Sequence, residues 1–184
     1  LRLTHLFEDR EGRMWVGGNR RFGFFSDDRF TDLTPDYISA FGSAPEWFCW
    51  GISQDGGGDI WLGMRELIRY DGANFTTYSE KDGLPAPAMG YAVCQGGEEG
   101  ELWIGGSDGL ARFDGQSFTE VESEITGVRH IDRDNSGRMW IGTLGQGVWY
   151  SDGDGFHRFT VRDGLPFDMV NSVHQDREGL FWMS

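Results

Sequence analysis

The sequence has little of what marks a nucleic-acid-binding, membrane-spanning or disulfide-stapled protein. Only 16 of its 184 residues are Lys or Arg, against 30 Asp or Glu, so the formal charge is −14. The longest basic run is the pair Arg20 and Arg21. A surface this acidic repels phosphate backbones and anionic lipid headgroups, which argues against both as partners. No apolar run approaches the roughly 20 residues of a membrane span, and the first residues, which do not begin with Met, lack the shape of a signal peptide.

Cysteine is scarce as well. Cys49 and Cys94 are too few for a disulfide scaffold, and neither lies in a CxxC pair of the zinc-binding or redox type. Glycine, at 29 residues, and tryptophan, at eight, are abundant instead. With 38% hydrophobic and 25% charged residues the chain falls in the globular range. The combination of Gly and Trp predicts many tight turns around aromatic anchors.

One tryptophan recurs in a fixed frame along the whole chain, at intervals of 46, 42, 37 and 42 residues. A Gly always lies three residues before this Trp and an aliphatic residue or Cys nine before it, and four of the five copies have an Asp six before it. A sequence period of about 40 residues indicates a fold built from repeated structural units. The five positions are Trp15, Trp61, Trp103, Trp140 and Trp182.

The Asp and Gly of this frame predict a tight turn between two strands. Asp is preferred at the first position of a type I turn, and Gly at the fourth takes the left-handed conformation that closes a bulged hairpin. A second hairpin follows each of the first four Trp residues, as in the matching stretches 69–76 and 112–119. Each unit is therefore expected to be four short antiparallel strands, which is one blade of a β-propeller. The turn residues are Asp9, Asp55, Asp134 and Asp176, with Gly97 in the third copy.

The expected fold class is all-β: a β-propeller segment of four four-stranded antiparallel blades and one trailing hairpin, in a single unit over residues 1–184. The blades are expected at about 1–46, 47–88, 89–126 and 127–168, with a partial blade at 169–184. The two chain ends duplicate the first strands of a blade instead of supplying complementary strands. We therefore expect a fragment of a larger propeller, whose uncapped end faces favour self-association.

The frame V-x-x-x-x-D-x-x-G-x-x-W-x-G, together with D-G-L-P at 82–85 and 163–166, resembles the two-component regulator propeller repeat over nearly the whole chain. The resemblance implies the periplasmic or extracellular input region of a hybrid histidine kinase. Such a region senses a nutrient, often a carbohydrate, and relays the signal to a kinase elsewhere in the full protein. Membrane attachment would then come only from other segments, and the full-length sensor would form homodimers. The departures are Gly97 and an insert through Trp47 and Trp50 after the first blade.

Candidate ligand-binding residues lie in loops that the repeat does not fix. If the first strand of each blade lines the axis, the loops between second and third strands and the connections between blades emerge together, on what we call the loop-bearing face. Trp rings there can stack on sugar rings. The alternative roles are hydrophobic packing for the two Trp residues and plain solvent exposure for the polar ones. The predicted ligand-binding residues, for a small-molecule or oligosaccharide ligand, are Arg20, Arg21, Trp47, Trp50, Arg65 and Gln146.

We expect no catalytic residue, cofactor or metal in this segment. The Asp-to-Trp spacing of six is one residue longer than in the sialidase turn motif, and no Ser/His/Asp or Cys/His set falls in one place. Asp132 and Asp134 resemble the start of a calcium loop, but Thr143 replaces the bidentate Glu, so calcium there stays open. The four histidines have no ligand spacing. The alternatives are a propeller enzyme of the glycosidase, sialidase or lyase type, and a purely structural or dimerisation propeller.

Overall fold

The computed structural model describes residues 3–43, 45, 48–87, 90–96 and 101–184. Within these residues the chain forms four four-stranded antiparallel meanders and one hairpin, so the expected all-β propeller fold is confirmed. The first blade is β1 (Leu3–Glu8), β2 (Met14–Gly18), β3 (Phe22–Ser26) and β4 (Arg29–Asp32). The second is β5 (Gly51–Gln54), β6 (Ile60–Gly63), β7 (Leu67–Tyr70) and β8 (Phe75–Tyr78). The third is β9 (Ala92–Gln95), β10 (Leu102–Gly105), β11 (Leu110–Phe113) and β12 (Phe118–Val121). The fourth is β13 (Val128–Arg133), β14 (Met139–Thr143), β15 (Val148–Ser151) and β16 (Phe156–Phe159), and the hairpin is β17 (Val173–Gln175) and β18 (Phe181–Met183).

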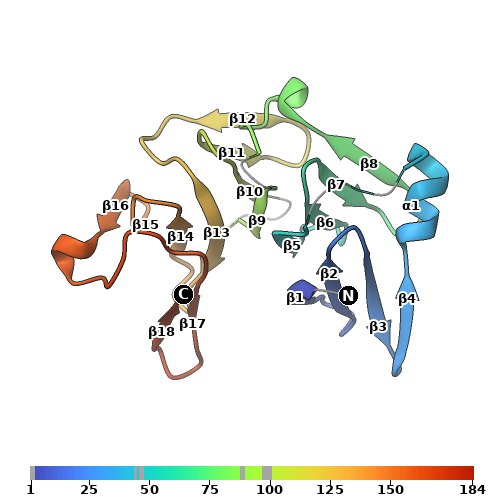
Figure 1. The fold of residues 1–184 in the computed structure, drawn as a ribbon, viewed down its shortest axis with the longest axis horizontal. Helices are drawn as coiled ribbons and strands as arrows, with labels where there is room; N and C mark the ends of the chain where they lie inside the picture. Colours follow the sequence, from blue (N-terminus) through green and yellow to red (C-terminus); the bar gives the residue numbers. More distant parts are fainter. Residues whose placement is uncertain (1–2, 44, 46–47, 88–89, 97–100) are drawn as a thin grey trace.

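The blades form an arc around a common axis, with the first strand of each blade nearest the centre (Figure 1). β1 contacts β5, β5 contacts β9, β9 contacts β13, and β13 contacts β17. The fourth strands β4, β8, β12 and β16 lie at the periphery. The second strands β6 and β14 are buried at every position, as their uninterrupted apolar pattern predicts for a sheet packed on both faces.

One α-helix interrupts the β pattern, α1 (Thr34–Phe41), between the first and second blades. The sequence predicted an insert here but not a helix, because eight residues without a side-chain N-cap give almost no periodic signal. Pro35 lies in its first turn, and Gly42, with φ +78°, ends it by donating its N–H to the Ile38 carbonyl. No helix in the described part of the chain is long and apolar enough to cross a membrane.

The repeated Asp holds both its turn and the Trp six residues later. Oδ1 of Asp9 accepts the backbone N–H groups of Glu11 and Arg13, and Oδ2 accepts the indole N–H of Trp15 at 2.6 Å. The turn was predicted from the sequence, whereas the bond to the indole was not. The same bond recurs from Trp61 to Asp55 at 2.9 Å, from Trp140 to Asp134 at 2.9 Å, and from Trp182 to Asp176 at 2.7 Å.

Asp55→Ala is expected to lower the unfolding free energy by about 2 kcal/mol, because it leaves the buried indole N–H of Trp61 without an acceptor. Asp176→Ala is the matched control. It removes the same kind of bond, but Trp182 is 62% exposed and water can replace the carboxylate. Urea unfolding of both variants measures the difference. Equal losses would mean that the turn, and not the indole, carries the effect.

Neighbouring blades approach closely at the Gly that lies two residues after each of the first four frame Trp residues. A Cβ on Gly63 would lie 1.8 Å from the carbonyl oxygen of Tyr91, which leads into the next blade. The sequence predicted room for a large side chain at these glycines, and at Gly63 the neighbour is backbone instead. The other close neighbours are Cys49 at Gly17, Val128 at Gly105 and Val170 at Gly142.

Both D-G-L-P copies form the same turn. The short 3-10 helices η1 (Glu80–Asp82) and η2 (Val161–Asp163) each begin with a reciprocal side-chain cap and end at a left-handed Gly, with φ +92° at Gly83 and +108° at Gly164. Leu84 after the first copy is buried in the core of the second and third blades. The turn therefore anchors the connection that leads from one blade to the next.

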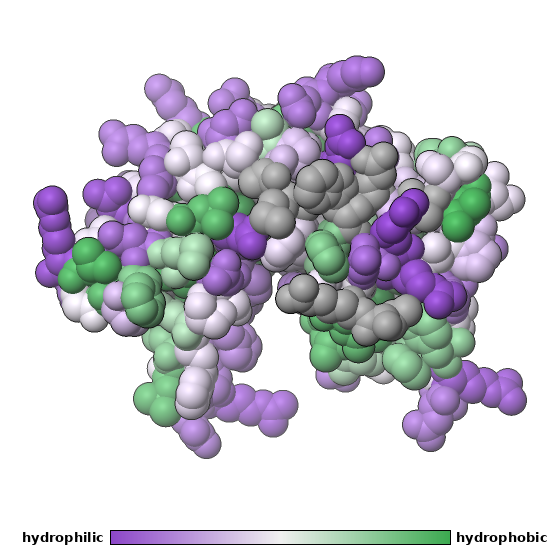
Figure 2. All heavy atoms as spheres, viewed as in Figure 1, coloured by the Kyte–Doolittle hydropathy of each residue, from purple (hydrophilic) through white to green (hydrophobic). Residues whose placement is uncertain are grey.

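Hydrophobic side chains are exposed at the two ends of the arc. Leu3 and Leu6 on β1 are 51% and 60% exposed, and Phe167 and Trp182 at the other end are 72% and 62% exposed. Figure 2 shows hydrophobic residues over the hairpin β17–β18, at the lower left of the view. In the interior blades the residues equivalent to Leu6 and Trp182 are packed between neighbours. These end faces are the surfaces on which the expected self-association would depend.

Candidate ligand-binding site

A cavity of about 530 Å³ lies where the inserted helix meets the loops of the second blade. We call it the insert pocket. Its volume is within the roughly 300–1,000 Å³ typical of small-molecule sites. Its walls come from α1, from the loop between β6 and β7, from η1 and from the segment before β9, which are the kinds of loop that make up the loop-bearing face. The floor is apolar and the rim polar: Met64, Ile68 and Tyr91 are fully buried, and Arg65, Glu66, Ser79, Glu80 and Lys81 surround them.

The helix sits where it does because of Tyr37. This side chain is buried and packs edge-on against Phe22 of the first blade and Phe75 of the second, with ring centroids 5.9 and 5.6 Å apart. The start of the helix is held by Thr34, whose Oγ1 accepts the backbone N–H of Phe22. The insert therefore bridges the first and second blades, and its Tyr37 forms part of one wall of the insert pocket.

Two tyrosines line the insert pocket. Burial and the adjacent Glu66 carboxylate raise the pKa of Tyr37 to about 12. Burial, followed by the negative charges of Glu80 and Asp108, also raises the pKa of Tyr91. Both hydroxyls are therefore neutral donors at physiological pH. The Tyr91 hydroxyl is buried and has no hydrogen-bond partner among the described residues, which costs free energy.

The charged rim of the insert pocket balances two cations against two carboxylates. Arg65 and Glu66 come from the β6–β7 loop, and Glu80 and Lys81 come from η1, with all four side chains exposed. Lys81 is the only lysine in the chain. A rim without net charge over an apolar floor suits a neutral polar ligand better than a strongly ionised one.

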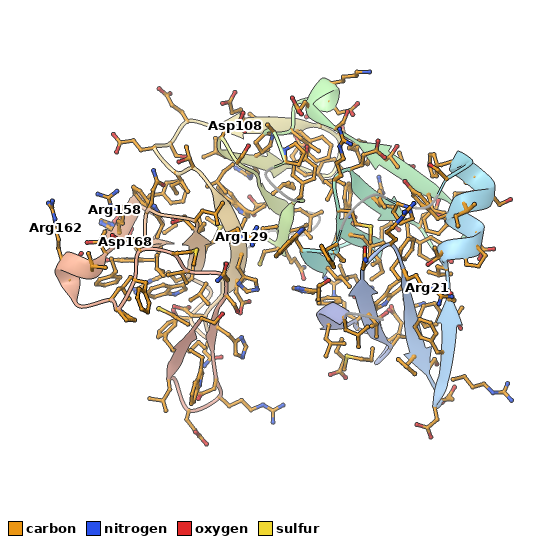
Figure 3. The ribbon with its side chains drawn as sticks, in the orientation of Figure 1. Arg21, Asp108, Arg129, Arg158, Arg162 and Asp168 are labelled. Atoms are coloured by element: carbon orange, nitrogen blue, oxygen red, sulfur yellow. The ribbon has the colours of Figure 1, made fainter. Side chains whose placement is uncertain are left out.

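The other predicted residues are not gathered around the insert pocket. Arg21 forms an ion pair with Asp32, at 2.5 Å, on the outer part of the first blade (Figure 3). Arg20 is exposed at the β2–β3 turn with φ +59°, in the left-handed region. Both oxygen and nitrogen of the Gln146 amide are used, since Oε1 accepts the Thr126 N–H and Nε2 donates to the Glu124 carbonyl.

The structure describes one of the two predicted tryptophans of the insert. Trp47 lies outside the described residues. Trp50 is half-buried beside the axis, where the Arg129 guanidinium of β13 lies 4.1 Å from its ring centroid, near the centre of the arc in Figure 3. One face of the Trp50 ring is thus already covered by a cation. Of the predicted residues that the structure describes, only Arg65 lines the insert pocket, and stacking of a sugar on Trp47 or Trp50 stays a prediction.

A second cavity, of about 590 Å³, follows the axis between the first strands of the blades. We call it the axial cavity. His5 of β1, His130 of β13 and His174 of β17 all line it, although their sequence spacing gave no sign of a site. The frame contained the signal: His5 and His130 both lie ten residues before their Trp, and His174 lies eight before. Alternate residues of a first strand reach the axis together, so aligning the repeats would have grouped them.

Metal ligands do not converge in the described part of the chain, where no group of three or more His, Cys, Asp or Glu side chains could hold an ion. Asp134, from the calcium-like string, uses Oδ1 for the backbone N–H groups of its own turn and Oδ2 for Trp140. Asp132 bonds His174 through Oδ2, at 2.9 Å. These carboxylates are thus occupied by structural contacts.

A family model described as "Two component regulator propeller" matches residues 2–20, so the predicted resemblance is confirmed over that segment. The sequence has no significant match among curated proteins.

Solved structures with this fold include both sensors and enzymes. The extracellular domain of a hybrid two-component system from B. thetaiotaomicron matches with a TM-score of 0.76 at 17% identity, over 98% of this chain and 26% of that one. The extracellular domain of a one-component system from the same organism matches with a TM-score of 0.65 at 20% identity, over 97% and 27%. Virginiamycin B lyase from Staphylococcus aureus matches with a TM-score of 0.70 at 14% identity, over 98% and 62%. The chain therefore spans only part of each related structure, and the likeness establishes the fold.

Proposed function

We propose that this chain is a non-catalytic, ligand-sensing segment of a bacterial two-component sensor, which holds a neutral, saccharide-like ligand on its loop-bearing face. The observation that carries the proposal is the insert pocket, where an apolar floor and a charge-balanced polar rim meet beside an element that the repeat does not require. Sugars present apolar ring faces and many hydroxyls, and this pocket offers surfaces for both.

The family match and the extracellular domains of similar fold support a place outside the cytoplasm, with the signal relayed to a kinase in another part of the full protein. The acidic surface favours a neutral ligand over a polyanion. Because a lyase has a similar fold, turnover of the ligand must be measured together with its binding.

Lys81 gives a direct test, because its amine and the chain's N-terminal amine are the only primary amines present. Malto-, cello- and chito-oligosaccharides are titrated while tryptophan fluorescence is followed, and any binder is then present during reductive methylation. We expect saturable binding, protection of Lys81 with the N-terminal amine unprotected, and no change in the recovered sugar. Turnover of the sugar would favour the enzyme, and no saturable binding would favour a purely structural propeller.

Lys81→Ala is expected to weaken that binding about tenfold, the effect of losing a hydrogen bond to a charged donor. Arg162→Ala is the matched control, because Arg162 occupies the same position in η2, where no inserted helix covers the turn. If both variants weaken binding equally, or if Lys81→Ala does not weaken it, the assignment of the ligand site to the insert pocket is contradicted.

A further inference from the structure

The axial cavity has a polar wall that the insert pocket does not share. Three imidazoles enter it from three different sheets, with Ser53 of β5 and Gln95 of β9 between them. The rings of His5 and His130 lie 6.3 Å apart between centroids, although 125 residues separate them in the chain. The propeller arrangement, and not local sequence, has therefore brought these groups to one place.

Two hydrogen bonds indicate where the ring protons of His130 and His174 lie. Nδ1 of His130 accepts the backbone N–H of Val173 at 3.4 Å, so the neutral ring carries its proton on Nε2 as a donor. Nδ1 of His174 lies 2.9 Å from Oδ2 of Asp132, which makes Nδ1 the donor; in the neutral ring Nε2 is then the acceptor. The imidazole of His5 makes no hydrogen bond within the described residues and contacts the His130 ring instead. The wall thus presents donors and acceptors side by side.

This mixture selects one class of ligand. An anion needs donors alone and would face the Asp132 carboxylate, and the described residues hold no three-ligand group for a metal cation. Burial lowers the pKa of both His5 and His130, so neither ring supplies a positive charge near neutral pH. A hydroxyl group both donates and accepts, so neighbouring hydroxyls match neighbouring donors and acceptors.

We propose that the axial cavity is a second ligand site, separate from the insert pocket, which takes a small neutral polyhydroxyl compound such as a monosaccharide or cyclic polyol through His5, His130 and His174. The proposal rests on the proposed function, since it adds a second site for the same chemical class. The two sites share no lining residue, so each can fail without the other.

The chain carries its own control for the test. Its four histidines include His157, which pairs with Asp152 on the outer hairpin of the fourth blade, 3.0 Å away and outside the axial cavity. Imidazole nitrogen signals of the whole chain are followed by NMR near neutral pH during titration with D-glucose, N-acetyl-D-glucosamine and myo-inositol. We expect one of these to shift the signals of the three axial histidines together and saturably, while those of His157 stay in place. No saturable shift with any of the three compounds, or an equal shift of His157, would overturn the proposal.

His174→Ala adds a second readout, because this side chain is 64% exposed and its loss should not disturb folding. It is expected to weaken axial binding about tenfold, measured on the His5 and His130 signals, whereas Lys81→Ala should leave it unchanged. Unchanged affinity in His174→Ala would contradict the axial site. If oligosaccharides protect Lys81 but no compound shifts the signals of the axial histidines, the axial site is contradicted and the insert pocket is not. If the axial signals shift but Lys81 is not protected, the insert pocket is contradicted and the axial site is not.

Discussion

Gly63→Ala is expected to lower the unfolding free energy by about 3 kcal/mol or more, the upper end of what overpacking costs. The added Cβ would meet the carbonyl oxygen of Tyr91, which leads into the neighbouring blade, at 1.8 Å. The N–H of Tyr91 also bonds the carbonyl of Met64 across the two blades at 3.1 Å. The neighbouring blade cannot retreat without breaking this bond. Chemical unfolding, followed by tryptophan fluorescence, measures the loss.

Gly155→Ala is the control for this substitution, because no heavy atom lies within 4 Å of its Cβ position. It should change stability by no more than about 0.5 kcal/mol, as is usual for surface sites. Comparable losses in the two variants would mean that general backbone effects of Ala, and not the close approach of two blades, explain the result. Gly17→Ala should fall between them, since the atoms it would meet belong to the Cys49 side chain.

The repeated positions of the sequence were enough to predict the fold. Trp, Gly and Asp recur at fixed spacings because each blade packs on the next in the same way, and this regularity is visible without any structure. The carboxylate-to-indole bond escaped prediction because a turn already explains an Asp at that position. Helix α1 escaped because one short insert has no repeat to compare it with.

The candidate sites could be predicted far less well, for a related reason. Arg65, which lines the insert pocket, was proposed because the β6–β7 loop departs from the frame, but Tyr37 and Tyr91 were not, since each looks like an ordinary core residue. Gln146 was expected to face a ligand and instead clamps the backbone between the third and fourth blades. The axial histidines belong to different repeats, so only their shared register relative to the Trp could have brought them together.

The burial of His5 and His130 beside the axis leads us to expect that the unfolding free energy depends on pH. Burial, followed by the charge of His130, lowers the pKa of His5 to about 4, against the opposing influence of Asp132. Burial also lowers the pKa of His130, with His174 acting in the same direction and Asp132 against it. Between pH 6.5 and about 4 the unfolded chain binds protons at these rings that the folded chain excludes. The unfolding free energy should therefore stay level above this window and fall as the pH decreases through it.

The expected loss between about pH 7 and pH 4.5 is roughly 2 kcal/mol from His5 alone, and His130 adds to it. Carboxylates with lowered pKa values and the cysteine thiol of β9 do not reproduce this window. The pKa values of Asp9 and Asp134 are lowered, so their contribution is lost only at more acidic pH, and burial raises the pKa of the Cys94 thiol to about 12. Urea unfolding as a function of pH should show a shallower slope in His5→Gln. His157→Gln, on the outer hairpin, should leave the slope intact, and a slope that survives His5→Gln would place its origin outside the axis.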